Sequence, residues 1–321
     1  MSGPRSVNVR ENECVVTCVV RNGEDYVDSF LQHYFQLGCR HIFFLDNGST
    51  DNTIPIAQQH PNVTVYSSDL PINGYQALLK KWLARRATEG QGWCVDADID
   101  EFLAYPYRDV VGMARLLDYL NGNGFTAVIT QMLDMFSDQE VPPPAQSGAD
   151  EDLKHDYEYY DLSDVTRQQY GSAELTHEYG RGNTVSNDRA ALFWGGIRKT
   201  LYGNNCLLTK HSLFRPSEVE LFPHVHFVNN ASLADISCVL LHFKLTRAAL
   251  GTAIQNRDRF SANSATYQRF IDLLQREPAF SVKRETAARL RSIDELVDNF
   301  LFVSDAYRAF AQTVVARHTM V

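Results

Sequence analysis

The first hundred residues alternate between short apolar runs and segments whose apolar side chains recur every three or four positions. Apolar runs at residues 13–20, 41–46 and 62–68 have the length and β-branched or aromatic content of buried strands. Residues 24–38 and 74–88 between them have the spacing of amphipathic helices, and Gly38 is expected to end the first helix. In the second helix we expect four residues to face the core: Leu78, Leu79, Trp82 and Leu83. This alternation predicts an α/β protein with a mostly parallel sheet flanked by helices.

The remaining chain divides into three parts. Residues 137–190 are polar, acidic and rich in tyrosine, so we expect a long insertion or lid there. Short apolar runs between residues 191 and 245 indicate further strands and turns. Beyond Thr246 the spacing predicts helices over residues 247–260, 265–277 and 284–302. We therefore expect a catalytic α/β domain over residues 1–245 and a C-terminal helical extension over 246–321.

Composition narrows the class of protein. The 321 residues are 44% hydrophobic and carry a net charge of −9, which favours a globular core and argues against nucleic acid as a partner. We see neither a signal peptide nor an apolar run long enough for a membrane span. The six cysteines are scattered and form no CxxC pair, as expected for reduced core residues of a cytoplasmic protein.

The segment "GWCVDADIDEFLAYP" at residues 92–106 combines acids with large apolar residues. If it continues as a strand, Asp96, Asp98 and Asp100 share one face, about 6–7 Å apart. Their mutual repulsion could be relieved by a divalent cation, and hard carboxylate oxygens suit Mg²⁺ or Mn²⁺. The alternative is a strand end that opens into a solvated acidic loop. The flanking aromatic residues favour the metal site, because they anchor this segment in a core.

An ordered set of segments resembles the family 2-like glycosyltransferases with a D-x-D-E-F metal motif, and is also similar to family 92-type enzymes. The segments are "RNGEDYVDSFLQHYFQLGCRHIFFLDNGSTDNT", "WCVDADIDEFL", "WGGIRKTLYG", "LTKHSLF", "SLADISCVLLHFKL" and "RFSANSATYQRFIDLL". The resemblance implies a GT-A (Rossmann-like) fold and a nucleoside-diphosphate sugar donor, with a UDP-sugar favoured. It also implies a glycan or other hydroxyl acceptor, Mn²⁺ or Mg²⁺ as cofactor, and usually inversion at the anomeric carbon.

The same resemblance suggests roles for individual residues. Asp46 and Asn47 match the turn that recognises the nucleotide, and Asn22 matches the polar residue after the first strand. The chain reads Asn22-Gly23-Glu24 where related sequences commonly read Asn-Glu, which puts the acceptor in doubt. The resemblance also implies three metal ligands, Asp98, Asp100 and His242, of which Asp98 would also contact the donor. It implies that Lys244 contacts the diphosphate of the donor.

Other candidates follow from the residues themselves. Gly195 and Gly196 permit close backbone approach, and the cations after them, Arg198 and Lys199, suit a diphosphate. A tight turn with solvated basic residues is the alternative there, and the same ambiguity holds for Lys210. For the general base we consider four residues, of which the first also matches a histidine of the family pattern: His226, Asp134, Glu220 and Glu218. His226 is otherwise a structural histidine.

Three competing functions make different demands on the sequence. A D-x-D phosphohydrolase would need a later Gly-Asp motif, and the chain has no Gly-Asp dipeptide. A nucleotidyltransferase would need a glycine-rich loop after the first strand, and "VVRNGEDYV" has none. A non-catalytic protein that binds nucleotide sugars stays open, because the base is unassigned.

Overall fold

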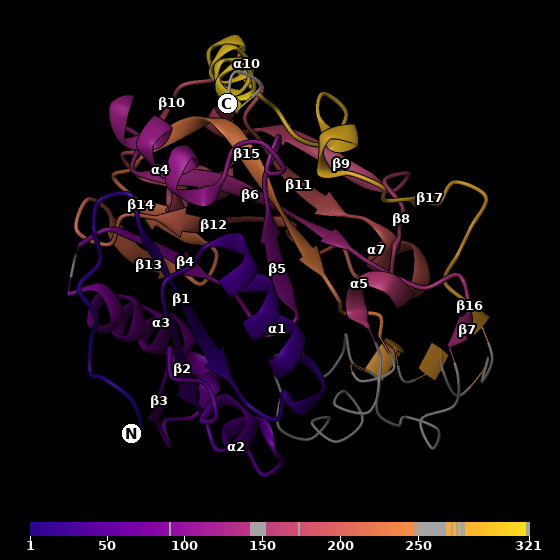
Figure 1. Ribbon diagram of the computed structural model, residues 1–321. Coiled ribbons are helices and arrows are strands. Elements are labelled where there is room, and N and C mark those ends of the chain that lie inside the picture. The colour runs from indigo at the N-terminus through magenta and orange to yellow at the C-terminus, as the bar shows by residue number, and fades with distance from the viewer. Residues whose placement is uncertain are drawn as a thin grey trace.

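The computed structural model describes residues 1–89, 91–141, 152–172, 174–246 and 280–318, together with residues 249, 268–270, 272–273 and 276. Its central feature is a nine-stranded mixed sheet (Figure 1). Eight strands follow the order β10 (Thr184–Val185), β15 (Ser232–His242), β6 (Ala127–Asp134), β12 (Thr209–Phe214), β4 (Trp93–Asp96), β1 (Cys14–Val20), β2 (Ile42–Asp46) and β3 (Val63–Ser67). The ninth, β5 (Glu101–Ala104), pairs with β15.

Most of the sheet is parallel. Only β12 and β5 run against their neighbours, and β12 lies between β4 and β6. The predicted α/β class, with a mostly parallel sheet flanked by helices, is therefore confirmed. The carboxyl ends of β1, β2 and β4 lie at one edge, since Val20 is paired with Asp46 and Thr17 with Asp96.

Helices cover both faces of the sheet. Successive residues of β1 point in opposite directions, so this apolar strand contributes to the core on each face. Val16 and Cys18 pack in the larger core, to which α1 (Glu24–Leu37) and α4 (Met113–Gly122) contribute. Val15 packs on the other face with Leu79 and Leu83 of α3 (Ile72–Thr88). The sequence correctly predicted that these two leucines face inward. Leu78 and Trp82 are exposed, however, because the buried face of α3 is centred on Leu83 and also takes in Lys80.

The described part of the predicted insertion is built onto the main domain. It contains β7 (Glu140–Val141), α5 (Leu153–Asp156), β8 (Tyr159–Tyr160), β9 (Val165–Gln169), the 3-10 turn η2 (Tyr170–Ser172) and α6 (Glu174–Tyr179). Its last strand, β10, joins the main sheet, and β9 pairs with β11 (Ala191–Gly195). The elements between and beyond are α2 (Thr53–Ala57), α7 (Ile197–Tyr202), β13 (Glu220–His224), β14 (Phe227–Asn229), β16 (Phe280–Ser281), β17 (Ala288–Arg289), η3 (Ile293–Leu296) and α10 (Asp305–His318).

The C-terminal segment differs from the prediction. The helices expected over 247–260 and 265–277 fall mostly outside the described residues. The helix expected over 284–302 is wrong, because only β17 and the short η3 occur there. Backbone groups bond across the fold instead: Leu290 N donates to Glu158 O at 2.7 Å, and Ser237 N donates to Phe302 O at 3.0 Å. Tertiary pairing thus overrides local helix propensity.

Two expectations about the whole chain can be compared with the structure. All six cysteines are free thiols, and only Cys206 is not fully buried, as expected for reduced core residues. None of the described helices combines the length and the apolar character that crossing a bilayer requires.

Candidate active site

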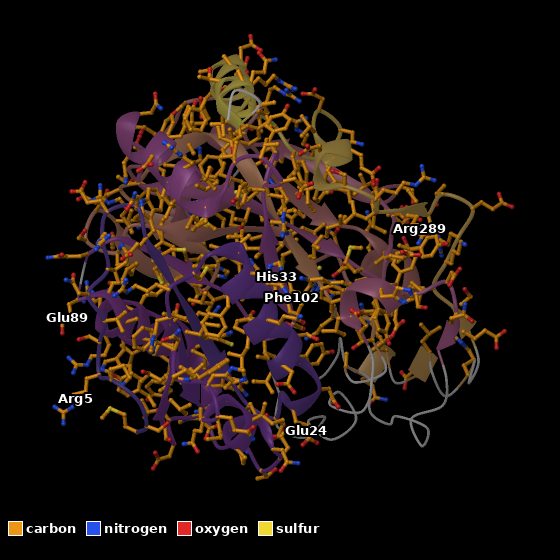
Figure 2. All side chains as sticks on the ribbon, viewed as in Figure 1. Arg5, Glu24, His33, Glu89, Phe102 and Arg289 are labelled. Carbon is orange, nitrogen blue, oxygen red and sulfur yellow. The ribbon has the colours of Figure 1, made fainter. Side chains whose placement is uncertain are left out.

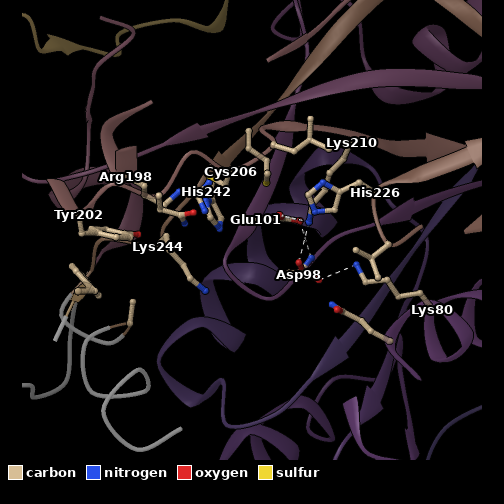
Figure 3. Close-up of a pocket in the computed structure, with 17 residues that line it drawn as sticks. Lys80, Asp98, Glu101, Arg198, Tyr202, Cys206, Lys210, His226, His242 and Lys244 are labelled. Atoms are coloured by element: carbon tan, nitrogen blue, oxygen red, sulfur yellow. Dashed lines mark hydrogen bonds and ion pairs between the residues drawn. The ribbon is translucent and has the colours of Figure 1, made fainter. Parts of the chain in front are cut away.

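A cavity of about 460 Å³ opens at the edge where β4, β6 and β15 end. In α/β sheets this carboxyl edge is the usual place for ligands. Charged residues from six parts of the chain line it: α3, the segment between β4 and β5, the start of β5, α7, β12 and the end of β15. Figure 3 shows two groups facing the cavity, one around Asp98 and the other around His242.

The acidic segment does not continue as a strand. β4 ends at Asp96, and Glu101 N donates to Asp98 O at 2.9 Å to form a turn before β5 begins. The expected single face of Asp96, Asp98 and Asp100 is therefore wrong. The turn instead directs Asp98 and Asp100 to different partners.

Asp98 lies between two lysines. Lys80 Nζ is 2.9 Å from Asp98 Oδ1, while Lys210 Nζ is 2.9 Å from Asp98 Oδ2 and 2.5 Å from Glu101 Oε1 (Figure 3). Lys80 Nζ is also 2.7 Å from Asp96 Oδ2. We call these five residues the lysine–carboxylate network. Burial opposes ionisation of Asp98, but Lys210 and Lys80 outweigh it and hold its pKa well below the usual range. The pKa of Asp96 is raised, chiefly by burial.

The second group is centred on His242. Its Nδ1 is 2.6 Å from Asp134 Oδ1, and its Nε2 is 3.5 Å from Asp100 Oδ2. Burial disfavours the imidazolium, but the Asp100 and Asp134 carboxylates outweigh this and raise the pKa of His242. Lys244 Nζ is also 3.5 Å from Asp100 Oδ2. Burial would raise the pKa of Asp100, yet Lys244 and His242 lower it, so this carboxylate is ionised.

The hydrogen-bonding capacity of the Arg198 guanidinium is only partly used. Its Nε donates to Asp134 Oδ2 at 2.8 Å, and its side chain is almost fully buried at the cavity wall. The Nη2 atom is buried and has no hydrogen-bond partner among the described residues. A buried donor of this kind normally finds an acceptor, and phosphate is the anion that guanidinium groups recognise best. Arg198 therefore suits an anionic ligand.

Two side chains at His242 are placed to share a divalent cation. Within the described part of the chain, no three His, Cys, Asp or Glu side chains are grouped to hold a metal. Asp100 Oδ2 and His242 Nε2 nevertheless stand 3.5 Å apart, and neighbouring ligands of one octahedral Mg²⁺ are about 3 Å apart. Mg²⁺ commonly takes one or two protein ligands and completes its shell with substrate phosphates and water. Two of the three predicted ligands thus fit such an ion, while Asp98 is paired with lysines.

The predicted nucleotide turn lies at the same sheet edge but outside the cavity lining. Asp46 Oδ1 accepts from Ser49 N at 2.9 Å, and Asn22 Oδ1 accepts from Thr50 N at 2.8 Å. Asn47 Nδ2 donates to Ser68 O at 2.9 Å and to Leu70 O at 2.7 Å. Asn22 and Asn47 therefore connect the loops after β1, β2 and β3, and the roles predicted for them in nucleotide binding stay untested.

The candidate bases separate clearly. His226 lines the cavity, and its Nδ1 lies 3.2 Å from Thr209 O. Burial and then the Lys210 ammonium hold the pKa of His226 well below its usual value. Asp134 sits behind the wall, where Arg198 and His242 outweigh burial and lower its pKa. Glu220 on β13 accepts from Asn229 at 3.3 Å, and it, Glu218 and Lys199 are not among the cavity-lining residues.

Sequence reasoning missed several residues that the cavity brings together. Lys80 and Glu101 belong to the lysine–carboxylate network, and Gln76 and Tyr202 also line the wall. Glu101 could have been found, since it directly follows the D-x-D repeat. Nothing in the sequence singles out Lys80, because the adjacent Lys81 is also a lysine within the same predicted helix.

Comparisons with known proteins do not assign the chain to a family. No protein-family model and no curated protein matches the chain. A crystal structure of S. aureus TarS 1-349 has a TM-score of 0.39 and 12% identity, covering 83% of this chain and 71% of that chain. A crystal structure of S. aureus TarS has a TM-score of 0.38 and 13% identity, covering 84% of this chain and 44% of that chain. At these scores the likeness supports no conclusion about function.

Proposed function

We propose that the protein is a glycosyltransferase that moves a sugar from a nucleoside-diphosphate sugar to a hydroxyl acceptor. The single observation that carries the proposal is Arg198, whose buried Nη2 lacks a partner among the described residues and which lines the same cavity as Lys244 and His242. Asp100 is not itself a lining residue, but its Oδ2 lies 3.5 Å from both His242 Nε2 and Lys244 Nζ. A diphosphate supplies an acceptor oxygen for Arg198 Nη2, and its negative charge suits the Lys244 ammonium beside it. The resemblance of the ordered sequence segments and the sheet architecture agree with a GT-A enzyme.

In the proposed reaction an acceptor oxygen attacks the anomeric carbon as the bond from that carbon to the diphosphate oxygen breaks. The nucleoside diphosphate leaves with the bonding electrons, and the acceptor hydroxyl gives its proton to a base. Arg198 and Lys244 donate hydrogen bonds to the phosphate oxygens, where negative charge grows. Asp134 orients both Arg198 and His242 through its two carboxylate oxygens.

Asp100 and His242 would hold the Mn²⁺ or Mg²⁺ ion. When bound there, the ion supplies positive charge beside the leaving diphosphate. His242 accepts Mn²⁺ more readily than Mg²⁺, because imidazole is a softer ligand than carboxylate. Asp98 orders Lys80 and Lys210 on the opposite wall, and its assignment as a third ligand stays a prediction.

His226 is the proposed base. Donation from Nδ1 to Thr209 O leaves Nε2 as the proton acceptor, and its lowered pKa keeps the ring neutral near pH 7. Attack from the face opposite the leaving group would invert the anomeric carbon. We also propose that the transferred sugar is a hexosyl group and that the enzyme acts in the cytoplasm.

The test combines calorimetry with a panel of nucleotide sugars, Mn²⁺ and simple glycan acceptors, scored for released nucleotide. Arg198→Lys keeps the charge beside Asp134 but loses the Nη2 donor, so donor affinity should fall at least about tenfold, the effect of one lost charge-assisted hydrogen bond. Arg115→Lys on the exposed face of α4 is the matched control. Asp100→Asn should abolish turnover, and Asp118→Asn should not.

Each alternative predicts a different result. Tight donor binding without nucleotide release from any acceptor mixture would indicate a non-catalytic binding protein. Release of inorganic phosphate without sugar transfer would indicate a phosphohydrolase. Equal donor affinity in wild type and Arg198→Lys would refute the role assigned to Arg198 Nη2.

A further inference from the structure

The outer face of α3 carries an exposed apolar stripe. Tyr75, Leu78 and Trp82 are 44%, 53% and 45% exposed, and their spacing of three and four residues puts them on one side of the helix. Leu70, directly ahead of the helix, is 43% exposed. Half of the large apolar side chains that are exposed among the described residues therefore lie on this short stretch. Single exposed apolar residues are common, but a contiguous row of them typically marks a site that binds another protein or a membrane.

Cations border the stripe on both sides. At 100° per residue, Arg86 lies on one side of the Tyr75–Leu78–Trp82 line, and Arg85 and Lys81 lie on the other. None of these three cations forms an ion pair with a described residue. The helix sequence "INGYQALLKKWLARRAT" contains no acidic residue, in a chain whose net charge is −9. The local charge is thus opposite in sign to that of the whole molecule.

The helix is held rigidly in this orientation. Its inner face packs on β1 through Leu79 and Leu83, and the ion pairs of Lys80 with Asp96 and Asp98 fix its rotation. Trp82 makes an edge-to-face contact with Tyr66 at a ring-centre distance of 5.0 Å. Figure 2 shows Glu89, which directly follows α3, at the outer margin of the molecule. The stripe is therefore a preformed surface rather than a helix that must fold on binding.

We propose that this face of α3 docks the protein onto an anionic lipid bilayer. Tyrosine, tryptophan and leucine partition into the headgroup region, and lysine and arginine beside them meet anionic headgroups. A second copy of the chain fits less well, because a two-fold contact places each basic stripe against itself. Charge complementarity thus favours a negatively charged surface over self-association.

The cavity lies on the other side of α3 from the stripe. Gln76 and Lys80 of the same helix line the cavity wall, and at 100° per residue they lie roughly 130–170° around the helix from the centre of the stripe. The helix therefore separates the docking surface from the cavity, and the docking does not rest on the proposed function.

Vesicle co-sedimentation of the full chain tests the docking directly. The protein should sediment with vesicles of phosphatidylcholine and phosphatidylglycerol, and much less with phosphatidylcholine alone. Raising the salt from about 0.1 M to about 1 M should release it, since the screening length falls from about 10 Å to about 3 Å. Leu78→Ser combined with Trp82→Ser, and separately Arg85→Gln combined with Arg86→Gln, should each reduce the bound fraction at least tenfold.

Matched controls change similar side chains elsewhere. Val110→Ser, at a site 40% exposed, and Arg115→Gln on α4 should bind vesicles as the wild type does. Thermal unfolding should be unchanged in the arginine variants, which shows that they fold. Vesicle binding that is absent, or unaffected by both double variants, overturns the proposal. A dimer in light scattering that the Leu78→Ser and Trp82→Ser pair converts to monomer would assign the stripe to self-association instead.

Discussion

The lysine–carboxylate network makes Lys80 the most informative residue for a stability experiment. Its ammonium group is fully buried between Asp96 and Asp98, at 2.7 and 2.9 Å. Lys80→Met preserves much of the side-chain volume and removes the charge. Asp98 keeps Lys210, but Asp96 would lose its only ion-pair partner among the described residues. We expect the substitution to leave a buried carboxylate uncompensated.

The size of the effect follows from that uncompensated charge. Removing one partner of a buried ion pair typically costs about 3–5 kcal/mol. For a domain of this size about 1 kcal/mol lowers Tm by roughly 2 °C, so Lys80→Met should melt on the order of 6–10 °C below wild type. Lys81→Met, at the next position on α3, should change Tm by no more than about 1 °C, as surface substitutions do.

The loss should also depend on pH. Burial already raises the pKa of Asp96, and removing Lys80 raises it further, so the folded variant binds a proton more tightly than the unfolded chain. When the pKa of a carboxyl is higher in the folded state than in the unfolded state, proton binding stabilises the folded state at low pH. This stabilisation is complete below the pKa of the unfolded state and is lost as pH rises through the pKa of the folded state. The Tm difference from wild type should therefore be larger near pH 8 than near pH 5.

Differential scanning calorimetry at the two pH values provides the measurement, and Lys80→Met combined with Asp96→Leu provides the control. The double variant removes both charges and should recover at least half of the lost Tm. An unchanged Tm in the single variant, or a loss that the second substitution does not relieve, would refute the reasoning from the buried ion pair.

Three further predictions concern other parts of the chain. Burial lowers the pKa of His33 to about 3, so below about pH 6.5 the unfolded chain binds a proton that the folded protein excludes. His33→Gln should therefore flatten the fall of Tm between about pH 6.5 and 4.5, and a fall as steep as that of wild type would refute this prediction. Asp46→Ala should weaken nucleoside-diphosphate binding in calorimetry, and equal affinity would remove Asp46 from the donor site. His226→Ala should keep donor binding and lose sugar transfer, and full turnover would exclude it as the base.

The N-terminal half of the sheet was predictable because its signals are local. The apolar run at residues 13–20 became β1, and the helix expected from residue 24 to Gly38 runs over Glu24–Leu37. Each element there is decided by side chains within one turn or one strand. Gly38 takes a positive φ of 99°, as a glycine after a helix commonly does.

The features that escaped prediction depend on partners distant in sequence. Lys80 is buried only because Asp96 and Asp98 lie across from it, and nothing within α3 marks it apart from Lys81. The apolar residues of segment 284–302 have helical spacing, yet its backbone forms hydrogen bonds with β8 and β15 in place of helical ones. His33 is another example, since its stacking on Phe102 at 4.9 Å depends on where β5 runs (Figure 2).

The placement of β12 has a consequence for how the chain is made. β4 and β6 never pair with each other, because β12 lies between them, and β15 must then add to the far side of β6. A nascent chain that has emerged only to residue 208 therefore carries β6 with both edges open, which is a surface prone to pair with other chains. Asp134 and His242 meet only when β15 is complete, about 100 residues after β6 emerges. Translation past His242, rather than folding of the N-terminal half, decides when the site exists.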